Sequence, residues 1–324
     1  MPISDQKRKP KYRRQKDAFN VRILPRDEEI VRQVMKHRLM TSEHIAALIG
    51  GSRYPILRRL QKLFHAGYLD RPPEQILASR KEGSSPMVYA PGNEGQRLLA
   101  GKLGIPVGRL GWTEKNRQIR ARFLAHTLQV TGFMVALEVA CRQEAGIDLI
   151  PQEGILRQMS EEARKARRPL IWQVSAKVEE NRGRKTCTFS MEPDGVFGIR
   201  VRDLPEGRNR RHFFLEADQG TMPLRAGNMH RSSIFKKMVG YFASWEQGLF
   251  GERYPFRKAR AIFLAASDRR IENMIELQRQ LDPKGKGSGV FLFVNQDMLS
   301  LENPGILLGK VFINGRGERV SLVD

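Results

Sequence analysis

The chain has 324 residues, with 57 Lys and Arg against 35 Asp and Glu, and a formal net charge of +22. This length and an apolar content of 40% exclude disorder throughout and predict about two folded domains, while the charge predicts a polyanionic partner. Two scattered cysteines, Cys141 and Cys187, exclude a disulfide scaffold or a cysteine zinc site. No apolar run approaches the ~18 residues that span a membrane, and no secretory signal begins the chain. We therefore expect a cytoplasmic, DNA-associated protein with no membrane contact.

Residues 1–22 form a basic N-terminal segment. The stretch from Lys7 to Lys16 (KRKPKYRRQK) has almost no apolar content, which predicts a disordered basic arm. Lys and Arg side chains on such an arm release counterions when they contact DNA phosphates. The alternative is a solubilising tail or a localisation signal.

Residues 23–103 show the pattern of three short helices followed by a hairpin. Pro25 suits the first turn of a helix, Thr41 or Ser42 caps the second helix, and Ser52 caps the third. This order predicts a winged helix-turn-helix domain whose third helix enters the major groove of DNA. The alternative is a protein-interaction module with the same apolar skeleton. The predicted DNA contacts are cations of the third helix and of the hairpin, namely Arg53, Arg58, Arg59, Lys62, Arg80 and Lys81.

Residues 104–113, rich in Gly with one Pro, predict a linker to a second domain at 114–324. A long helix is expected from Glu114 to about Glu144, and a charged, irregular insertion at 160–185. Apolar runs separated by helices then predict an α/β domain with a mixed sheet, so the whole chain is of the α+β class. The expected strands are 147–156, 188–199, 212–217, 261–266 and 289–295, the helices are 233–245 and 269–281, and Asn314-Gly315 marks a hairpin turn.

Carboxylates interrupt or end two of these apolar strands. Glu216 and Asp218 are two residues apart, so their side chains project from the same face of a strand. With Asp194 on a neighbouring strand they predict an oxygen-rich pocket of the kind that binds Mg²⁺ or Mn²⁺. The alternative is that these carboxylates pair with arginines such as Arg225 or Arg231 at the sheet edge.

Pro193-Asp194 and Glu216, with Lys237 on the following helix, resemble the active site of the PD-(D/E)xK nuclease superfamily. The resemblance implies a restriction-endonuclease-like fold with Asp194, Glu216 and Asp218 as metal ligands and catalytic residues. The position at which the superfamily carries its lysine holds Asp218 here. Lys237 is therefore the candidate for the group that holds the attacking water. Glu138, late on the long helix, lies where some members place an extra acid.

Ordered motifs also extend over most of the chain, from Arg26 to the last predicted strand. They are Arg26-Asp27, LQKLFHAGYL at 60–69, His126, Pro193-Asp194, FLEADQGT at 214–221 and KMVGY at 237–241.

In this combination the chain resembles the replication-relaxation family of bacterial plasmids and mobile elements. The resemblance implies a role in replication, mobilisation or DNA relaxation, with DNA and other replication or mobilisation proteins as partners. Three functions stay open: a nuclease or nickase that uses Mg²⁺ or Mn²⁺, an inactive nuclease-like DNA binder, and a non-catalytic replication or transcription regulator.

Overall fold

The computed structural model describes residues 11–15, 21–76, 85–103, 112–180 and 183–324. The chain divides into two compact units, unit 1 (Met1–Val135) and unit 2 (Ala136–Asp324). This division differs from the predicted linker at 104–113. Residues 104–111 lie outside the described residues, and the helix that follows them belongs to unit 1.

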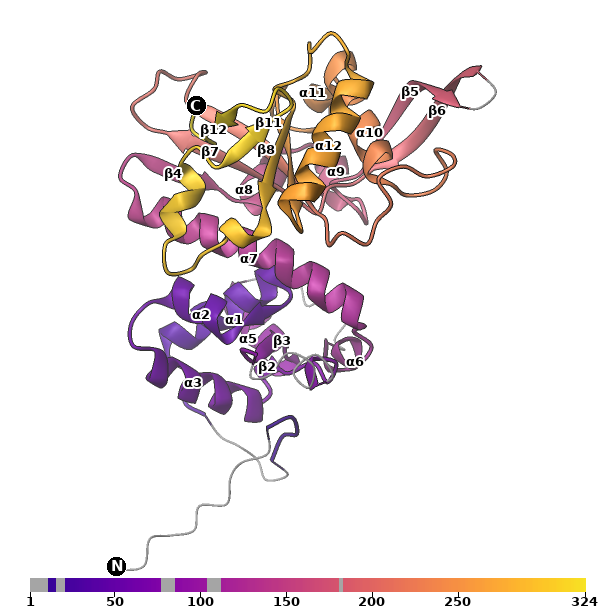
Figure 1. Cartoon of the computed structure of the whole chain (residues 1–324). Coiled ribbons are helices and arrows are strands. Elements are labelled where there is room, and N and C mark those ends of the chain that lie inside the picture. Colours follow the sequence, from indigo (N-terminus) through magenta and orange to yellow (C-terminus); the bar gives the residue numbers. More distant parts are fainter. Residues whose placement is uncertain (1–10, 16–20, 77–84, 104–111, 181–182) are drawn as a thin grey trace, which may run out of the picture. The chain divides into compact units, whose positions relative to one another are not determined.

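Unit 1 packs helices around a small antiparallel sheet (Figure 1). Strand β3 pairs with both β1 and β2, so the strand order is β1-β3-β2. The elements in chain order are α1 (Pro25–His37), β1 (Met40–Thr41), α2 (Ser42–Ile49), α3 (Arg53–His65), β2 (Leu69–Asp70), β3 (Val88–Pro91), α5 (Asn93–Leu103) and α6 (Trp112–Arg117).

Local hydrogen bonds explain where the first helices begin. The backbone N–H of Leu24 donates to Oδ2 of Asp27 at 2.7 Å, which holds the entry to α1. Of the two predicted caps for α2, Thr41 is the one used, because its Oγ1 accepts from His44 N at 3.1 Å. Ser52 precedes α3 as predicted, but its side chain makes no capping hydrogen bond with any described residue.

Unit 1 continues beyond the predicted boundary. The long helix expected from Glu114 is two helices, α6 and α7 (Ala121–Gln143). Ile119 and Leu124 are buried together with Leu39, Val88 and Ala90. The segment therefore contributes to the core of unit 1, and apolar burial explains why it belongs there.

Residues 11–15 of the basic arm lie against α3 and β2. Arg14 Nε donates to the carbonyl of Phe64 at 3.0 Å and Arg14 Nη2 donates to the carbonyl of Leu69 at 3.1 Å. The predicted disorder does not hold for these residues, because the guanidinium satisfies carbonyls at and after the end of a helix. Residues 1–10 and 16–20 lie outside the described residues.

Unit 2 is built on a seven-stranded mixed sheet of order β12-β11-β10-β9-β8-β7-β4. The central strands β8, β9 and β10 are parallel, and the other pairs are antiparallel. The α+β class with a large mixed sheet is confirmed. The strands are β4 (Ile147–Ile150), β7 (Gly195–Val201), β8 (Arg210–Ala217), β9 (Arg260–Ala265), β10 (Phe291–Asn295), β11 (Phe312–Asn314) and β12 (Arg319–Val320).

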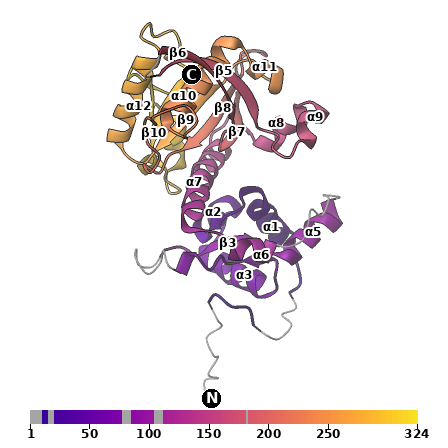
Figure 2. The same cartoon turned by 90° about the vertical axis from the view of Figure 1, so that its right-hand side faces the viewer.

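Two crossover helices connect the parallel strands and lie side by side against the sheet (Figure 2). They are α10 (Ile234–Gln247) and α12 (Asp268–Leu281). Phe214, Phe263 and Phe291 belong to the core on this side. Leu215 and Ile262 alternate with them and are also fully buried, so both faces of the central strands are covered. Shorter helices are α8 (Gln152–Gln158), α9 (Glu161–Lys165), α11 (Phe250–Arg253) and the 3₁₀ turns Gln296–Met298 and Pro304–Leu308.

The prediction that residues 160–185 form an irregular insertion is wrong. This segment contains α9 and most of an antiparallel ribbon, β5 (Trp172–Glu180) with β6 (Gly183–Met191). The far end of this ribbon extends past α10 in Figure 1. Trp172, Val174, Ala176 and Val178 are all buried, whereas the residues between them are exposed. The alternation is that of a half-buried strand, and the charged residues of the exposed face concealed it.

Two predicted strands are shorter in the structure than expected. The run at 188–199 is broken at 192–194, where β6 ends and β7 has not begun. The run at 147–156 stops at Ile150, because Pro151 precedes the helix α8. The hairpin at Asn314-Gly315 is confirmed, since Asn314 N donates to the carbonyl of Glu318 between β11 and β12.

Helix α7 contradicts the expectation that no segment is apolar enough to span a membrane. Among the described helices, it alone is long and apolar enough to cross a membrane by length and composition. A core helix passes the same test, and Phe133 and Leu137 of α7 are fully buried.

Candidate functional site

Three carboxylates meet where β8 ends in unit 2. Asp194 immediately precedes β7, and its backbone N–H donates to the carbonyl of Leu215 at 3.0 Å. Its side-chain Oδ2 accepts from Ala217 N at 2.9 Å. Antiparallel pairing of Gly195 with Leu215 thus carries Asp194 to the end of β8. The predicted proximity of Asp194 to the strand of Glu216 is present.

Glu216 is the most enclosed of the three carboxylates, with 1% of the residue exposed. Its Oε1 accepts from the hydroxyl of Tyr241 at 2.6 Å, and its Oε2 accepts from Lys237 Nζ. Lys237 and Tyr241 are one turn apart on α10, so they face the same carboxylate. Lys237 Nζ also lies 4.0 Å from Oδ2 of Asp194.

Asp218 has a different cation. Nε of Arg270, in the first turn of α12, donates to Oδ2 of Asp218 at 2.7 Å, and Nη2 of Arg270 donates to Oδ1 at 3.2 Å. The alternative of pairing with an arginine is therefore realised at Asp218. The partner, however, is neither Arg225 nor Arg231. Arg225 donates to Gln280 Oε1 instead.

Burial dominates the electrostatics of this cluster. It raises the pKa of Glu216 to about 7, with a further rise from Asp194, while Lys237 and Tyr241 act in the opposite direction. Burial lowers the pKa of Lys237, but Glu216 and Asp194 outweigh it, so the pKa is raised overall and the ammonium stays charged. The pKa of Tyr241 is raised well above its ordinary value, first by burial and then by Glu216.

This arrangement does not fit a divalent metal ion. Glu216 and Asp194 converge on the ammonium of Lys237, and Arg270 uses both oxygens of Asp218. Within the described ranges, no group of three His, Cys, Asp or Glu side chains has the geometry to hold a metal. The donor set is thus compensated by protein cations rather than left open for Mg²⁺ or Mn²⁺. The chemistry that the residues perform as they stand is charge pairing.

One other acid that the sequence suggested for this site lies in an ion pair. Glu138, the expected extra acid, accepts from Arg142 Nη2 at 2.6 Å on the same helix. Sequence reasoning did not select Tyr241, whose hydroxyl donates to Glu216. The signal was its spacing of four residues from Lys237.

The predicted DNA contacts divide into paired and unpaired cations. Arg59 Nε donates to Oδ1 of Asp27 at 2.6 Å, and its Nη2 donates to the carbonyl of Arg22. Arg53 Nη2 lies 3.4 Å from Oε1 of Glu43. Arg80 and Lys81 lie outside the described residues.

Arg58 and Lys62 are exposed on α3 and make no ion pair with any described residue. Tyr54, which sequence reasoning did not select, is 75% exposed on the same helix. Spacings of four residues place Tyr54, Arg58 and Lys62 along one side of α3. We call these three residues the α3 face. The signal in the sequence was an aromatic residue four positions before an arginine on the predicted third helix.

A family model described as replication-relaxation matches residues 31–256, which is more than two thirds of the chain. No curated protein and no solved structure matches the chain. The match includes the motifs at 60–69, 214–221 and 237–241. It also includes Asp194, so the three carboxylates of the cluster and Lys237 all lie within it.

Proposed function

Because this chain belongs to the replication-relaxation family, we propose that it is a DNA-binding replication protein of a plasmid or another mobile element. Unit 1 is the module that docks on duplex DNA. Unit 2 takes part in this function but does not cleave phosphodiester bonds. In this role the protein is associated with DNA in the cytoplasm and meets other replication or mobilisation proteins there.

The element order of unit 1 supports a winged helix-turn-helix module. Helices α1, α2 and α3 are followed by the antiparallel pair β2 and β3, which is the element order of a winged helix. In such modules the last of the three helices enters the major groove. Helix α3 holds that position here.

The observation that carries the proposal is the α3 face. Its cations Arg58 and Lys62 are exposed and lack an acidic partner among the described residues, whereas Arg59 on the other side of the helix is committed to Asp27. Unpaired cations on an exposed helix are free to replace counterions at phosphates or to contact guanine. A net charge of +22 adds a long-range attraction to DNA.

The test is equilibrium binding of the full chain to duplex DNA over a range of salt concentrations. We expect Arg58→Ala and Lys62→Ala each to weaken binding, and each lost phosphate contact to lower the slope of log K against log salt by about 0.9. The matched control is Arg117→Ala, an exposed cation on α6 that removes the same charge from unit 1. Equal effects of all three variants would reject docking through α3.

A metal-dependent nuclease is the second candidate, because Asp194, Glu216 and Lys237 converge as the PD-(D/E)xK resemblance implies. The pairing of Asp218 with Arg270 and the shared ammonium favour the non-cleaving function. Nicking of supercoiled plasmid with Mg²⁺ or Mn²⁺ separates the two. We expect no open-circle product from the wild type. Metal-dependent nicking that is lost in Asp194→Ala and kept in Asp203→Ala, an exposed acid, would establish the nuclease instead.

A further inference from the structure

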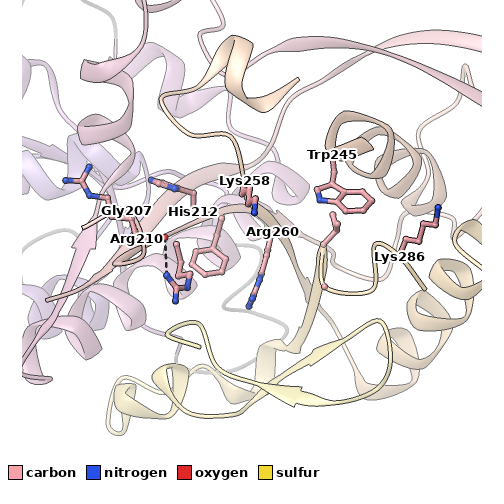
Figure 3. Close-up of a pocket in the computed structure, with 12 residues that line it drawn as sticks. Gly207, Arg210, His212, Trp245, Lys258, Arg260 and Lys286 are labelled. Atoms are coloured by element: carbon pink, nitrogen blue, oxygen red, sulfur yellow. Dashed lines mark hydrogen bonds between the residues drawn. The ribbon is translucent and has the colours of Figure 1, made fainter. Parts of the chain in front are cut away.

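A basic pocket of about 410 Å³ opens at the edge of the unit 2 sheet where β8, β9 and β10 begin. Figure 3 shows the labelled side chains around it, with the indole of Trp245 between Lys258 and Lys286 in that view. The residues that carry its character are Arg210, His212, Trp245, Lys258, Arg260 and Lys286.

The positive charge of this pocket is compensated only in part, by Asp324. Among the residues that line it there is no Asp or Glu. The lining has five cations, Arg210, Arg211, Lys258, Arg260 and Lys286. Nε of Arg211 donates to the carbonyl oxygen of Asp324 at 2.9 Å, and the other four form no ion pair in the part of the chain that the structure describes. Elsewhere in unit 2, several arginines are paired with acids; Asp148, for example, forms ion pairs with both Arg200 and Arg202. Cations gathered without acids indicate a site for an anion.

Among the cations of the pocket, Arg260 has the surroundings that least favour its charged form. Burial lowers its pKa, the neighbouring Arg211 lowers it further, and Asp324 only partly offsets these effects. His212 adds no charge at neutral pH, because burial and then Arg210 lower its pKa to about 4. A bound phosphate would relieve the repulsion between the arginines.

The pocket also offers an aromatic ring. Trp245 is half-buried, with its ring centroid 5.7 Å from that of Phe242. A cationic cavity beside an aromatic ring is the combination with which proteins hold single-stranded nucleic acid, because cations take the phosphate and the ring stacks on a base. A base within a duplex is stacked on both sides and does not present its face.

We propose that this pocket binds one nucleotide of single-stranded DNA, with its phosphate at Arg210, Lys258 and Arg260 and its base at Trp245. The inference rests on the proposed DNA-binding function and adds a second contact in unit 2, for an unpaired strand. The pocket is at the opposite end of β8 from the carboxylate cluster. The eight residues of β8 from Arg210 to Ala217 span about 23 Å, at about 3.3 Å for each step along an extended strand.

The first experiment compares binding of the full chain to a single-stranded oligonucleotide and to a duplex of the same sequence. We expect Lys258→Gln/Arg260→Gln to weaken single-strand binding at least tenfold and to lower its salt slope by about 1.4, at about 0.7 for each phosphate contact of a single strand. Duplex binding is expected to change less than threefold. The matched control, Arg269→Gln/Lys310→Gln, removes two exposed cations of unit 2 that do not line the pocket. Equal losses in both double variants, or an equal loss for duplex, would overturn the proposal.

The second experiment uses the fluorescence of tryptophan. The chain has Trp112, Trp172 and Trp245. We expect the single strand to quench emission in the wild type, and Trp245→Phe to abolish most of that quenching while keeping the fold, as measured by circular dichroism. Quenching that persists in Trp245→Phe would reject the base contact.

A third comparison identifies the source of the phosphate. We expect inorganic phosphate and a deoxynucleoside monophosphate to compete with the oligonucleotide only at concentrations at least a hundredfold above it. Competition by the monophosphate at oligonucleotide concentrations would assign the pocket to a free nucleotide and overturn the proposal. Loss of duplex binding in Arg58→Ala with no effect of the pocket variants would leave the proposed function in place and reject the inference alone.

Discussion

The hydroxyl of Tyr241 donates a 2.6 Å hydrogen bond to Oε1 of Glu216, a carboxylate that lies 25 residues earlier and is 1% exposed. The other oxygen of Glu216 accepts from Lys237. One helix face therefore supplies partners for both oxygens of a carboxylate that has no access to bulk water.

Replacing Tyr241 by Phe leaves Oε1 of Glu216 without its partner. Because a buried acceptor without a donor costs about 1–3 kcal/mol, we expect the free energy of unfolding to fall by that amount. Urea denaturation measures it. Tyr254→Phe is the matched control, because it also removes a buried tyrosine hydroxyl, but one that donates to the backbone carbonyl of Leu170 instead of to a carboxylate. If Tyr241 and Glu216 stabilise the fold through their shared hydrogen bond, the double variant Tyr241→Phe/Glu216→Gln will lose less free energy of unfolding than the two single variants added together.

The pKa of Glu216 gives unfolding a distinctive pH dependence. It is about 7 in the folded protein against an ordinary value of 4.5, so the folded state binds more protons between these values. The contribution of Glu216 to stability is full below pH 4.5 and is lost as pH rises through 7, by at most about 3 kcal/mol. The measurement is urea unfolding at pH 5 and pH 7.5. We expect the wild type to lose stability over this interval relative to Glu216→Gln; parallel curves for the two proteins would show that the carboxyl titrates normally.

Neighbouring arginines of α3 have opposite roles. Arg59 compensates Asp27, which is 1% exposed, so Arg59→Ala leaves a buried charge unpaired and we expect it to cost about 3–5 kcal/mol. Arg58→Ala removes an exposed cation, and we expect less than about 0.5 kcal/mol of destabilisation together with weaker DNA binding. Thermal unfolding and DNA binding of both variants test this division. Comparable stability of the two would contradict it.

Gly240 on α10 is a packing requirement. A Cβ at this position would lie 2.2 Å from Sδ of Met191, the last residue of β6. We expect Gly240→Ala to destabilise the protein by about 1–3 kcal/mol through overpacking, despite the better helix propensity of Ala. Adding Met191→Ala opens the space and is expected to recover part of the loss. No recovery in the double variant would place the strain elsewhere.

The sequence predicted elements whose apolar period was undisturbed. Helix α10 and strands β8 and β9 lie within two residues of the expected bounds. The ribbon of β5 and β6 escaped prediction because one face is charged and its composition resembled a loop. The boundary between the units escaped because Ile119 and Leu124 look the same in sequence whichever core they enter.

At the candidate site, the sequence predicted the meeting of Asp194, Glu216 and Lys237. It did not predict Arg270, which comes 52 residues after Asp218 and reaches it only because α12 follows the parallel strand β9. Long-range ion pairs depend on topology, and a single sequence offers many arginines as equal candidates.

The strands of the large sheet lie side by side in the order in which they are synthesised, from β4 through β7 to β12. As the chain leaves the ribosome, each new strand of this sheet can therefore pair with a strand that is already made, although the ribbon of β5 and β6 is synthesised between β4 and β7. Until the last strand arrives, every intermediate carries a growing edge, in addition to the edge at β4, that can pair with another nascent chain. The final strand has only two residues, Arg319 and Val320, which leaves a short edge on the finished sheet and reduces the surface at which such aggregation begins.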